Sequence, residues 1–265
     1  MREASVITST SNPRVQRARR LKRRIDRDRD GAFLIESVKS LEAAVRAGLD
    51  VRETFVREGA AEVMDRCRAL GLEVTIVTDR VLDAVADAAS TQGVVAVVAV
   101  PDTGLDRLPG EVSLVLVLAE VRDPGNAGTL VRSAAAAGAD AVIFTTESVD
   151  PFAPKTVRSS AGSLFAVPVM RGVSLDDVLD LLDARGLTIY LAEAAQGPIL
   201  SEVDLTVPVA FVVGNEAHGI PGEAGGARGG FLSIPMPGGT ESLNAAVAGS
   251  ILLYETVRQR LGTAG

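Results

Sequence analysis

The sequence contains only one cysteine and one histidine among its 265 residues. The single cysteine, Cys67, excludes an internal disulfide and any cysteine-rich metal site. A histidine-based site is also disfavoured, because zinc sites combine several Cys, His or acidic ligands and His218 has no second histidine to pair with. We therefore expect a protein without a metal centre.

Long apolar runs are missing as well. No segment approaches the roughly 20 apolar residues that a membrane-spanning helix needs. The Arg-rich N-terminus is not followed by the hydrophobic segment of a signal peptide. With 47% hydrophobic and 23% charged residues, the chain can bury an ordinary core. We expect a soluble cytoplasmic protein with one large or two modest domains.

Positive charge is scarce in the whole chain but concentrated at one end. The net charge is −7, yet residues 1–30 hold ten Arg or Lys and only four Asp or Glu. Such asymmetry suggests a basic helical arm that binds a polyanion, although a solvated helix face explains these residues equally well. The arm hypothesis assigns the contacts to Arg17, Arg20, Arg23 and Arg24.

Alternating apolar runs and helical patterns predict two α/β domains. Residues 10–29 predict one helix, whose apolar face would hold Val15, Ala18, Leu21 and Ile25. Residues 31–100 predict a small α/β domain, and the Pro- and Gly-rich residues 101–111 a linker. Residues 112–265 predict a doubly wound parallel sheet. Its strands are expected at 113–119, 141–145, 165–169, 187–192, 209–213 and 231–235.

Polar loops follow two of these expected strands. The run at 209–213 ends in Gly-Asn-Glu, and the run at 231–235 ends in Pro-Met-Pro-Gly-Gly before a helical pattern opens at 242–244. Ligands bind at such strand ends in open α/β sheets. No Gly-x-Gly-x-x-Gly with a ribose-binding acid is present, which disfavours a Rossmann-type methyltransferase or dehydrogenase.

Three separated blocks carry a more specific pattern. They read AEVRDPGNAGTLVRSAAAAGAD, VVGNEAHGI and IPMPGGTESLNAAVAGSILLYE. In order and spacing they resemble the three motifs of the SpoU (TrmH-type) RNA ribose methyltransferases, over roughly residues 113–260. The resemblance implies a trefoil-knot (SPOUT) domain, S-adenosylmethionine as cofactor, 2′-O-methylation of RNA and a homodimer formed through this domain.

The first domain carries a weaker resemblance. FLIESVKSLEAA and Thr-Gln-Gly-Val at 91–94 are similar to the ribosomal-protein-like substrate-binding domain that precedes many SpoU catalytic domains. The similarity favours ribosomal RNA as substrate and Lys39 as an RNA contact, although Ser37 and Lys39 depart from the residues usual there. Lys155 and Arg158 resemble a loop between the first two motifs and are expected to contact phosphate.

The cofactor contacts follow from the resemblance. A neutral adenine needs backbone N–H and C=O groups beside an apolar slot. The resemblance assigns the backbone contacts to Gly214, Ile234 and Leu243, and Leu191 is expected on the other side of the slot. The full set of expected cofactor residues is Gly214, Ile234, Leu243, Met236, Leu191, Asn215, Gly219, Ser242 and Asn244.

Arg132 is similar to the catalytic arginine of the family. Arginine stays protonated, so phosphate clamping and ribose orientation suit it better than proton removal. From its position alone, a surface ion pair is the simpler interpretation. Short polar residues at helix starts are caps by default and are expected here also to contact ligand or RNA. The expected catalytic residues are Arg132, Asn126, Glu216, Ser242 and Asn244.

Three other functions remain open at this point. A transfer-RNA 2′-O-methyltransferase and a non-catalytic RNA-binding module of the same fold would share these motifs. A small-molecule methyltransferase would leave the basic arm and the first domain unexplained. Carbon methylation of a pyrimidine needs a cysteine nucleophile, and Cys67 lies far from the ligand loops in sequence.

Overall fold

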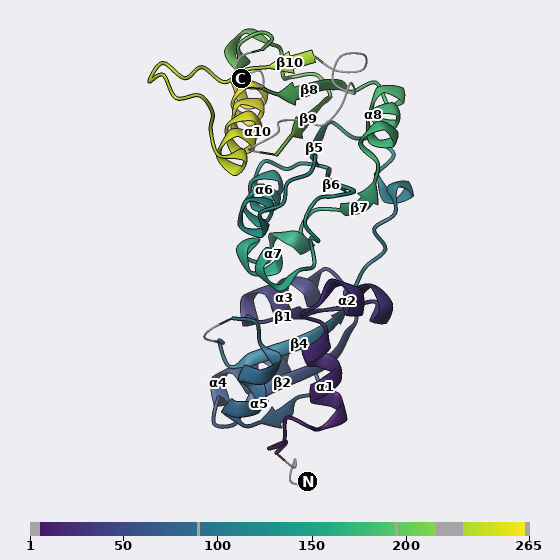
Figure 1. The fold of residues 1–265 in the computed structure, drawn as a ribbon, viewed down its shortest axis with the longest axis vertical. Helices are drawn as coiled ribbons and strands as arrows, with labels where there is room; N and C mark the ends of the chain where they lie inside the picture. The colour runs from purple at the N-terminus through teal and green to yellow at the C-terminus, as the bar shows by residue number, and fades with distance from the viewer. Residues whose placement is uncertain (1–5, 89–90, 194–195, 216–229, 263–265) are drawn as a thin grey trace. The chain divides into compact units, whose positions relative to one another are not determined.

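The computed structural model describes residues 6–88, 91–193, 196–215 and 230–262 (Figure 1). The chain forms two compact units, with residues 1–101 and 152–166 in unit 1 and residues 102–151 and 167–265 in unit 2. The boundaries expected from sequence differ from this division at two points. Residues 1–30 belong to unit 1, and so does the segment 152–166. No helix in the described part of the chain is long and apolar enough to cross a membrane.

Unit 1 is built on a mixed four-stranded sheet in the order β1-β4-β2-β3. The pairs β1–β4 and β4–β2 are antiparallel, whereas β2–β3 is parallel. Helices α1 and α5 pack together, and Val15, Ala18, Val81 and Leu82 on them join the core. The strands are β1 (Ala32–Ile35), β2 (Val51–Arg57), β3 (Thr75–Val77) and β4 (Val94–Ala99). The helices are α1 (Pro13–Arg20), α2 (Arg24–Asp30), α3 (Val38–Arg46), α4 (Ala61–Ala69) and α5 (Asp79–Val85).

The prediction of one continuous helix over residues 10–29 is wrong. The chain leaves the helix at Leu21 and begins α2 at Arg24. The buried Arg27 donates from Nη1 to the carbonyls of Leu21 and Lys22, both at 2.9 Å, and so satisfies acceptors that a continuous helix would use itself. As a consequence Ile25 is 71% exposed rather than part of the apolar face.

Residues 152–166 lie within the second sequence domain but pack in unit 1. They form α7 (Pro154–Ser159) and the 3₁₀ turn η2 (Ser163–Phe165). The rings of Phe152 and Phe165 lie 4.9 and 5.9 Å from the ring of Phe33 on β1, between ring centroids. The strand expected at 165–169 is therefore wrong, because Phe165 is held in η2 and β7 begins only at Val169.

Unit 2 confirms the doubly wound parallel sheet. In the described part of the unit, six strands form one sheet and are all parallel, in the order β10-β8-β9-β5-β6-β7. Alternate residues of β5 and β9 join a core cluster with α8, and α6 and α10 lie side by side, with α10 against β9 (Figure 1). The strands are β5 (Leu114–Leu118), β6 (Ala141–Thr145), β7 (Val169–Val173), β8 (Thr188–Ala192), β9 (Val209–Val213) and β10 (Gly230–Leu232). The helices are η1 (Leu105–Arg107), α6 (Pro124–Ala136), α8 (Leu175–Ala184), η3 (Leu200–Glu202) and α10 (Ala245–Gly262).

The trefoil knot stays a prediction. It depends on the path between β9 and β10, and residues 216–229 lie outside the described residues.

Candidate functional site

The strand order of unit 2 reverses at its central strand, β5. Strands β6 and β7 follow on one side, and β9, β8 and β10 lie on the other. Because all six strands are parallel, the carboxyl ends of β5, β8, β9 and β10 meet at one edge of the sheet, beside the switch point where ligands bind in such folds. The loops that leave this edge carry residues from all three sequence blocks.

Glu120, two residues beyond the end of β5, connects two of these loops. Its backbone is left-handed, with φ of 56°, which is costly for a residue other than glycine. Its N–H donates to Thr145 Oγ1 at 3.3 Å, and its carbonyl accepts from Asn215 Nδ2 at 3.2 Å. Asn215, assigned to the cofactor from sequence, thus ties the loop after β9 to the loop after β5. Sequence analysis did not single out Glu120, because a strained backbone leaves no residue-type signal at a glutamate.

The cofactor positions expected from sequence fall into two groups. Gly214, Ile234 and Leu243 lie outside helices and strands, so their N–H and C=O groups are not committed to a ladder. The side chains of Ile234, Met236 and Leu243 are half-buried beside them. This set of neutral donors, acceptors and apolar groups fits a nucleoside cofactor such as S-adenosylmethionine. Leu191 is fully buried in the core instead.

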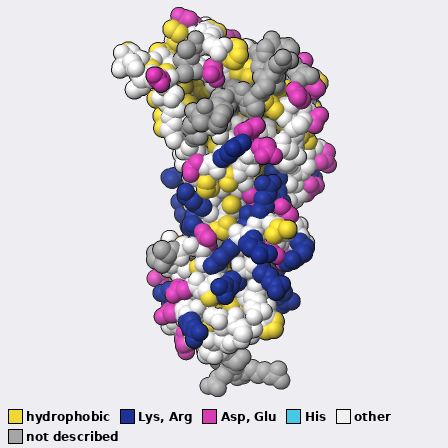
Figure 2. All heavy atoms as spheres, viewed as in Figure 1, with side chains coloured by type: hydrophobic (Ala, Val, Ile, Leu, Met, Phe, Trp, Pro, Cys, Tyr) yellow, Lys and Arg dark blue, Asp and Glu magenta, His cyan; other side chains and the backbone are white. Residues whose placement is uncertain are grey.

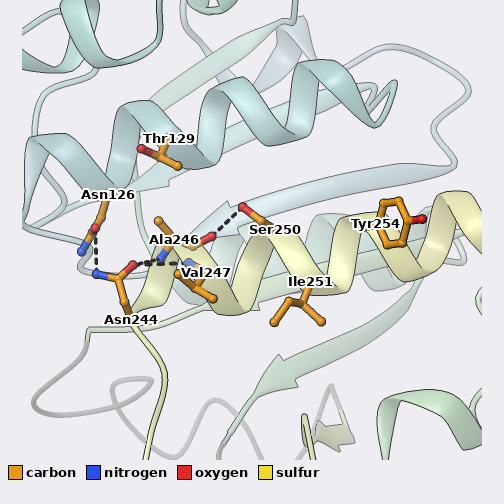
Figure 3. A pocket seen from close by; sticks show the side chains of 8 residues that line it. All are labelled: Asn126, Thr129, Asn244, Ala246, Val247, Ser250, Ile251 and Tyr254. Atoms are coloured by element: carbon orange, nitrogen blue, oxygen red, sulfur yellow. Dashed lines mark hydrogen bonds between the residues drawn. The ribbon is translucent and has the colours of Figure 1, made fainter.

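Two asparagines expected at the reacting centre contact each other (Figure 3). Asn244 caps α10, because its Oδ1 accepts from the N–H groups of Ala246 and Val247 at 2.9 and 3.3 Å. Its Nδ2 donates to Asn126 Oδ1 at 3.0 Å. Asn126 is not the cap of α6, since Asp123 Oδ1 accepts from the Asn126 N–H at 2.8 Å. Ser242 is exposed ahead of α10.

The seam between α6 and α10 requires a glycine. A Cβ at Gly249 would lie 2.3 Å from Leu130 Cδ2 and 3.3 Å from Val213 Cγ2. Beside this contact, the hydroxyl of Ser250, the next residue after Gly249, is hydrogen-bonded to the hydroxyl of Ser133 on α6 at 2.7 Å. Close packing of the two helices fixes the distance between the asparagines at their starts.

An open groove of about 460 Å³ lies along this seam (Figure 3). The amides of Asn126 and Asn244 lie at one end, and apolar side chains of α10 continue it. Val247 and Tyr254 are 48% and 69% exposed, and exposed apolar side chains that lie next to one another can mark an interaction surface. The groove is lined by Asn126, Thr129, Asn244, Ala246, Val247, Ser250, Ile251 and Tyr254.

Arg132 is not brought to the two asparagines within one chain. It is exposed on α6 and makes no hydrogen bond or ion pair with any residue in the described part of the chain. Six residues along an α-helix rotate a side chain by about 600°, so Arg132 leaves α6 about 120° away from Asn126. Glu216 and Gly219, two further expected site residues, lie outside the described residues.

The arginines of the N-terminal region separate into paired and unpaired groups. Arg23 pairs with Asp26 at 2.6 Å and Arg24 with Asp28 at 3.6 Å. By contrast Arg17 and Arg20 are exposed and form no ion pair with a described residue. Figure 2 shows Lys and Arg side chains gathered over α1 and α2. A groove of about 390 Å³ on this surface is lined by Gln16, Arg19, Arg20 and Arg23.

Arg19 was missed by sequence analysis, although its helical spacing could have identified it. Positions 16, 19 and 20 of α1 follow the three- and four-residue steps that place side chains on one helix face, and Arg23 follows at the N-cap of α2. We now include Arg19 among the residues of this basic surface.

The remaining expected RNA contacts all lie in unit 1. Lys39 is exposed in the first turn of α3, and Lys155 is exposed on α7. Arg158 is different, because its guanidinium pairs with Glu36 at 3.1 Å and with Asp87 at 3.0 Å. Its expected contact with phosphate therefore competes with two carboxylates.

Cys67 is buried on α4 of unit 1, and burial raises the pKa of its thiol. A neutral, buried thiol is a poor nucleophile, which agrees with the sequence argument against carbon methylation. Among the residues that the structure describes, no group of three or more His, Cys, Asp or Glu side chains could hold a metal ion.

Comparisons with known proteins cover almost the whole chain. The sequence model described as the SpoU rRNA Methylase family matches residues 113–254, and the MRM3-like substrate binding domain matches residues 12–96. The 23S rRNA (uridine(2479)-2'-O)-methyltransferase of Streptomyces viridochromogenes is 35% identical over 89% of this chain and 85% of its own length. The 23S rRNA (guanosine(2553)-2'-O)-methyltransferase RlmP of Bacillus subtilis is 32% identical over 94% of this chain and 97% of its own length. The crystal structure of the SpoU methyltransferase AviRb from S. viridochromogenes, in complex with the cofactor AdoMet, aligns with a TM-score of 0.87 and 31% identity, over 94% of this chain and 98% of that one.

Proposed function

This chain belongs to the SpoU rRNA methylase family, and we propose that it transfers a methyl group from S-adenosylmethionine to a ribose 2′-hydroxyl of ribosomal RNA. One observation carries the proposal for this chain. The loops of all three sequence blocks leave the same edge of the parallel sheet, beside the switch point between β5 and β9. The cytoplasm, where ribosomal RNA is found, is the expected location.

Each group of site residues has a distinct task in this reaction. Bound S-adenosylmethionine supplies an electrophilic methyl group on its sulfonium sulfur. The backbones of Gly214, Ile234 and Leu243 hold the neutral adenine without charge. The paired amides of Asn126 and Asn244 orient the acceptor ribose.

Arg132 is assigned to an RNA phosphate. The planar donors of its guanidinium suit bidentate phosphate binding. With Arg132 turned away from Asn126 in one chain, we propose that the site is completed in a homodimer, where Arg132 of one protomer serves the site of its partner. The exposed apolar groove on α10 supports this proposal, because a second copy would cover Val247 and Tyr254.

Dimer formation is testable by light scattering. The wild-type chain, with a monomer mass of 27.5 kDa, should give twice that mass at micromolar concentration. Tyr254→Glu should give monomers, because it places a charge in the apolar interface. Val207→Glu is the matched control, since Val207 is an exposed apolar residue of the same unit outside α10. A monomeric wild type would contradict the proposed dimer.

Unit 1 is assigned to RNA binding. Its match to a substrate-binding domain supports this role, and so do the exposed cations Arg17, Arg19 and Arg20 on α1 and the lysines of α3 and α7. Cations of this kind bind the phosphate backbone irrespective of sequence. The nucleotide that is methylated is selected by further contacts near the reaction site.

The proposal is tested by comparing RNA classes as methyl acceptors. Purified protein is incubated with S-adenosylmethionine carrying a tritiated methyl group and with separate preparations of ribosomal and transfer RNA. We expect label in ribosomal RNA alone. Gly214→Val, which fills the backbone approach to the cofactor, should lose both cofactor binding in calorimetry and methyl transfer. Label only in transfer RNA would overturn the substrate assignment. No label in any RNA, with RNA binding intact, would indicate a non-catalytic module.

A further inference from the structure

A buried carboxylate joins three separate segments of unit 1. The Glu36 side chain is 2% exposed and directly precedes Ser37, the N-cap of α3. It accepts hydrogen bonds from the N–H groups of Asp87 and Ala88 at 2.7 and 3.1 Å, just beyond α5. It also accepts from Arg158 Nη1 on α7 at 3.1 Å. The Glu36 carboxylate therefore connects the start of α3 to α7 and to the residues just beyond α5.

Arg158 bridges two acids rather than one. Its Nη2 donates to Asp87 Oδ2 at 3.0 Å, while Nη1 is bonded to Glu36. A buried carboxylate is costly unless it is paired and hydrogen-bonded. If Arg158 turned to an RNA phosphate, Glu36 would lose its only ion-pair partner in the described part of the chain. The geometry therefore favours a structural pair over a phosphate contact.

The segment of Arg158 also packs against the first turns of α3. Gly162 has φ of +91°, and a Cβ there would lie 3.2 Å from Ala43 Cβ and 3.6 Å from Ser40 Cα. The carbonyl of Lys39 lies 3.8 Å from the same point. The ammonium of Lys22 holds the end of α5 from another direction, because it donates to the carbonyls of Ala84, at 3.0 Å, and Ala86.

We propose that Arg158 and Glu36 are a positioning pair that aligns Lys39 of α3 with Lys155 of α7 as one RNA-binding surface, and that Arg158 itself contacts no phosphate. The proposal rests on the RNA-binding role assigned to unit 1 above. Under this proposal Arg158 is not one of the phosphate contacts that the sequence suggests. The proposal also gives a role in substrate binding to the buried Glu36, which lies in the stretch FLIESVKSLEAA but was not expected to act from sequence.

The test compares ribosomal-RNA affinity across a salt series for the full-length chain and three variants. Glu36→Gln and Arg158→Met should each weaken RNA binding about tenfold while leaving the slope of log affinity against log salt unchanged. Lys39→Met is the phosphate-contact control. It should lower that slope by about 0.7 to 0.9, the value for one lost contact. Cofactor affinity should stay at the wild-type value in all three variants, because the cofactor loops are in unit 2.

The sign of the Glu36→Gln effect separates the two roles of Arg158. Removing a negative charge from an RNA-binding surface should strengthen binding if only long-range electrostatics acts. The positioning pair predicts weaker binding instead. Arg158→Lys adds a second contrast, since it keeps the positive charge but cannot bridge both acids with a planar fork. It should bind RNA as weakly as Arg158→Met.

Several results would contradict the positioning role proposed for Arg158 and Glu36. A lower salt slope for Arg158→Met, with unchanged or tighter binding by Glu36→Gln, would make Arg158 a phosphate contact. Wild-type RNA affinity in both variants would limit the pair to a structural role. If Glu36→Gln does not fold by circular dichroism, Arg158→Lys decides, and wild-type affinity of that variant contradicts the proposal. If the wild-type protein bound RNA but transferred no methyl group, the proposed function would be refuted. The positioning role of Arg158 and Glu36 would not be affected by that result. A wild-type protein that bound no ribosomal RNA would refute both the proposed function and the positioning pair.

Discussion

At the scale of single residues, one helix cap fixes the chemistry of two amides. Asn244 Oδ1 is used by backbone N–H groups of α10, so the donor side of this amide must face Asn126. Each amide offers one oxygen acceptor and one NH₂ donor. Asn126 Oδ1 therefore accepts this hydrogen bond, and the pair holds both amides in one orientation.

Asn244→Asp should separate capping from this orienting role. Aspartate also caps helices, but it places an acceptor where Asn126 Oδ1 needs a donor. We expect thermal stability close to wild type and methyl transfer slowed at least about tenfold, equivalent to roughly 1.4 kcal/mol of barrier. Single-turnover rates measure the effect. An Asn244→Asp enzyme as fast as wild type would remove the amide pair from the reaction.

The residue scale is also where sequence analysis was least complete. The motifs placed Asn126, Asn244 and Gly214 in segments that follow strands of the parallel sheet, because motif spacing fixes the elements that carry them. They did not reveal that Asn215 is bonded to Glu120, that Leu191 is in the core or that Arg158 is paired with two acids. Each of these contacts joins residues distant in sequence, so neither residue type nor local period encodes it.

At the scale of elements, close packing of α6 against α10 requires a glycine at position 249. Gly249→Ala would press a methyl group against the buried Leu130. We expect a loss of about 1–2 kcal/mol in the free energy of unfolding, the usual cost of overpacking. Gly262→Ala is the control, because nothing lies within 4 Å of its added Cβ, and alanine favours a helix over glycine. Denaturant titration should show a lower midpoint only for Gly249→Ala, and equal midpoints would refute the close seam.

The second half of α10 is stabilised by a carboxylate with a strongly lowered pKa. Hydrogen bonds from Arg258, and then from Gln259, lower the pKa of Glu255 to about 2 from its ordinary 4.5. Gln259 in turn bonds the backbone of Val203 and Leu205. A lowered folded-state pKa contributes stability that is complete above the unfolded-state pKa and is lost as the pH falls toward the folded value.

Glu255→Gln should therefore be less stable than wild type above about pH 4.5, and the difference should shrink as the pH falls toward about 2. Unfolding curves of both proteins between these pH values measure it. A difference that stays constant with pH would show that the carboxylate charge does not stabilise α10.

Elements were predictable where their signal is local. Apolar runs of strand length gave the central strands of unit 2, and capping residues are a second local signal, since Ser37 and Ser174 are the N-caps of α3 and α8. The division of residues 10–29 into two helices was not predictable, because it depends on Arg27 folding back onto the carbonyls before it. The regular spacing of apolar residues in the sequence does not predict such a contact.

At the scale of the whole molecule, the chain passes between its two units three times. After β6 the chain leaves unit 2, and residues 152–166 pack in unit 1. The chain then returns to unit 2, where it forms β7. The family pattern is continuous across this excursion, so sequence comparison alone assigns the segment to the wrong compact unit. The two phenylalanines at its ends bury the ring of Phe33.

Phe152→Ala should therefore destabilise unit 1 rather than unit 2. Truncating a buried phenylalanine costs about 3–5 kcal/mol, and Phe152 is 1% exposed. Hydrogen exchange of the intact chain should show faster exchange for β1 amides, with β5 amides unchanged. Loss of protection in β5 alone would contradict the assignment of this segment to unit 1.

The central proposal for the whole molecule is that the loops beside the switch point hold S-adenosylmethionine and a ribose for methyl transfer. The most direct measurement is mass spectrometry of nucleosides from ribosomal RNA treated with the protein and S-adenosylmethionine. We predict one added methyl group per RNA molecule, located on the sugar fragment of a single nucleoside and missing after treatment with Gly214→Val. A methyl group located on a base fragment, or no added mass in RNA that the protein binds, would contradict the central claim.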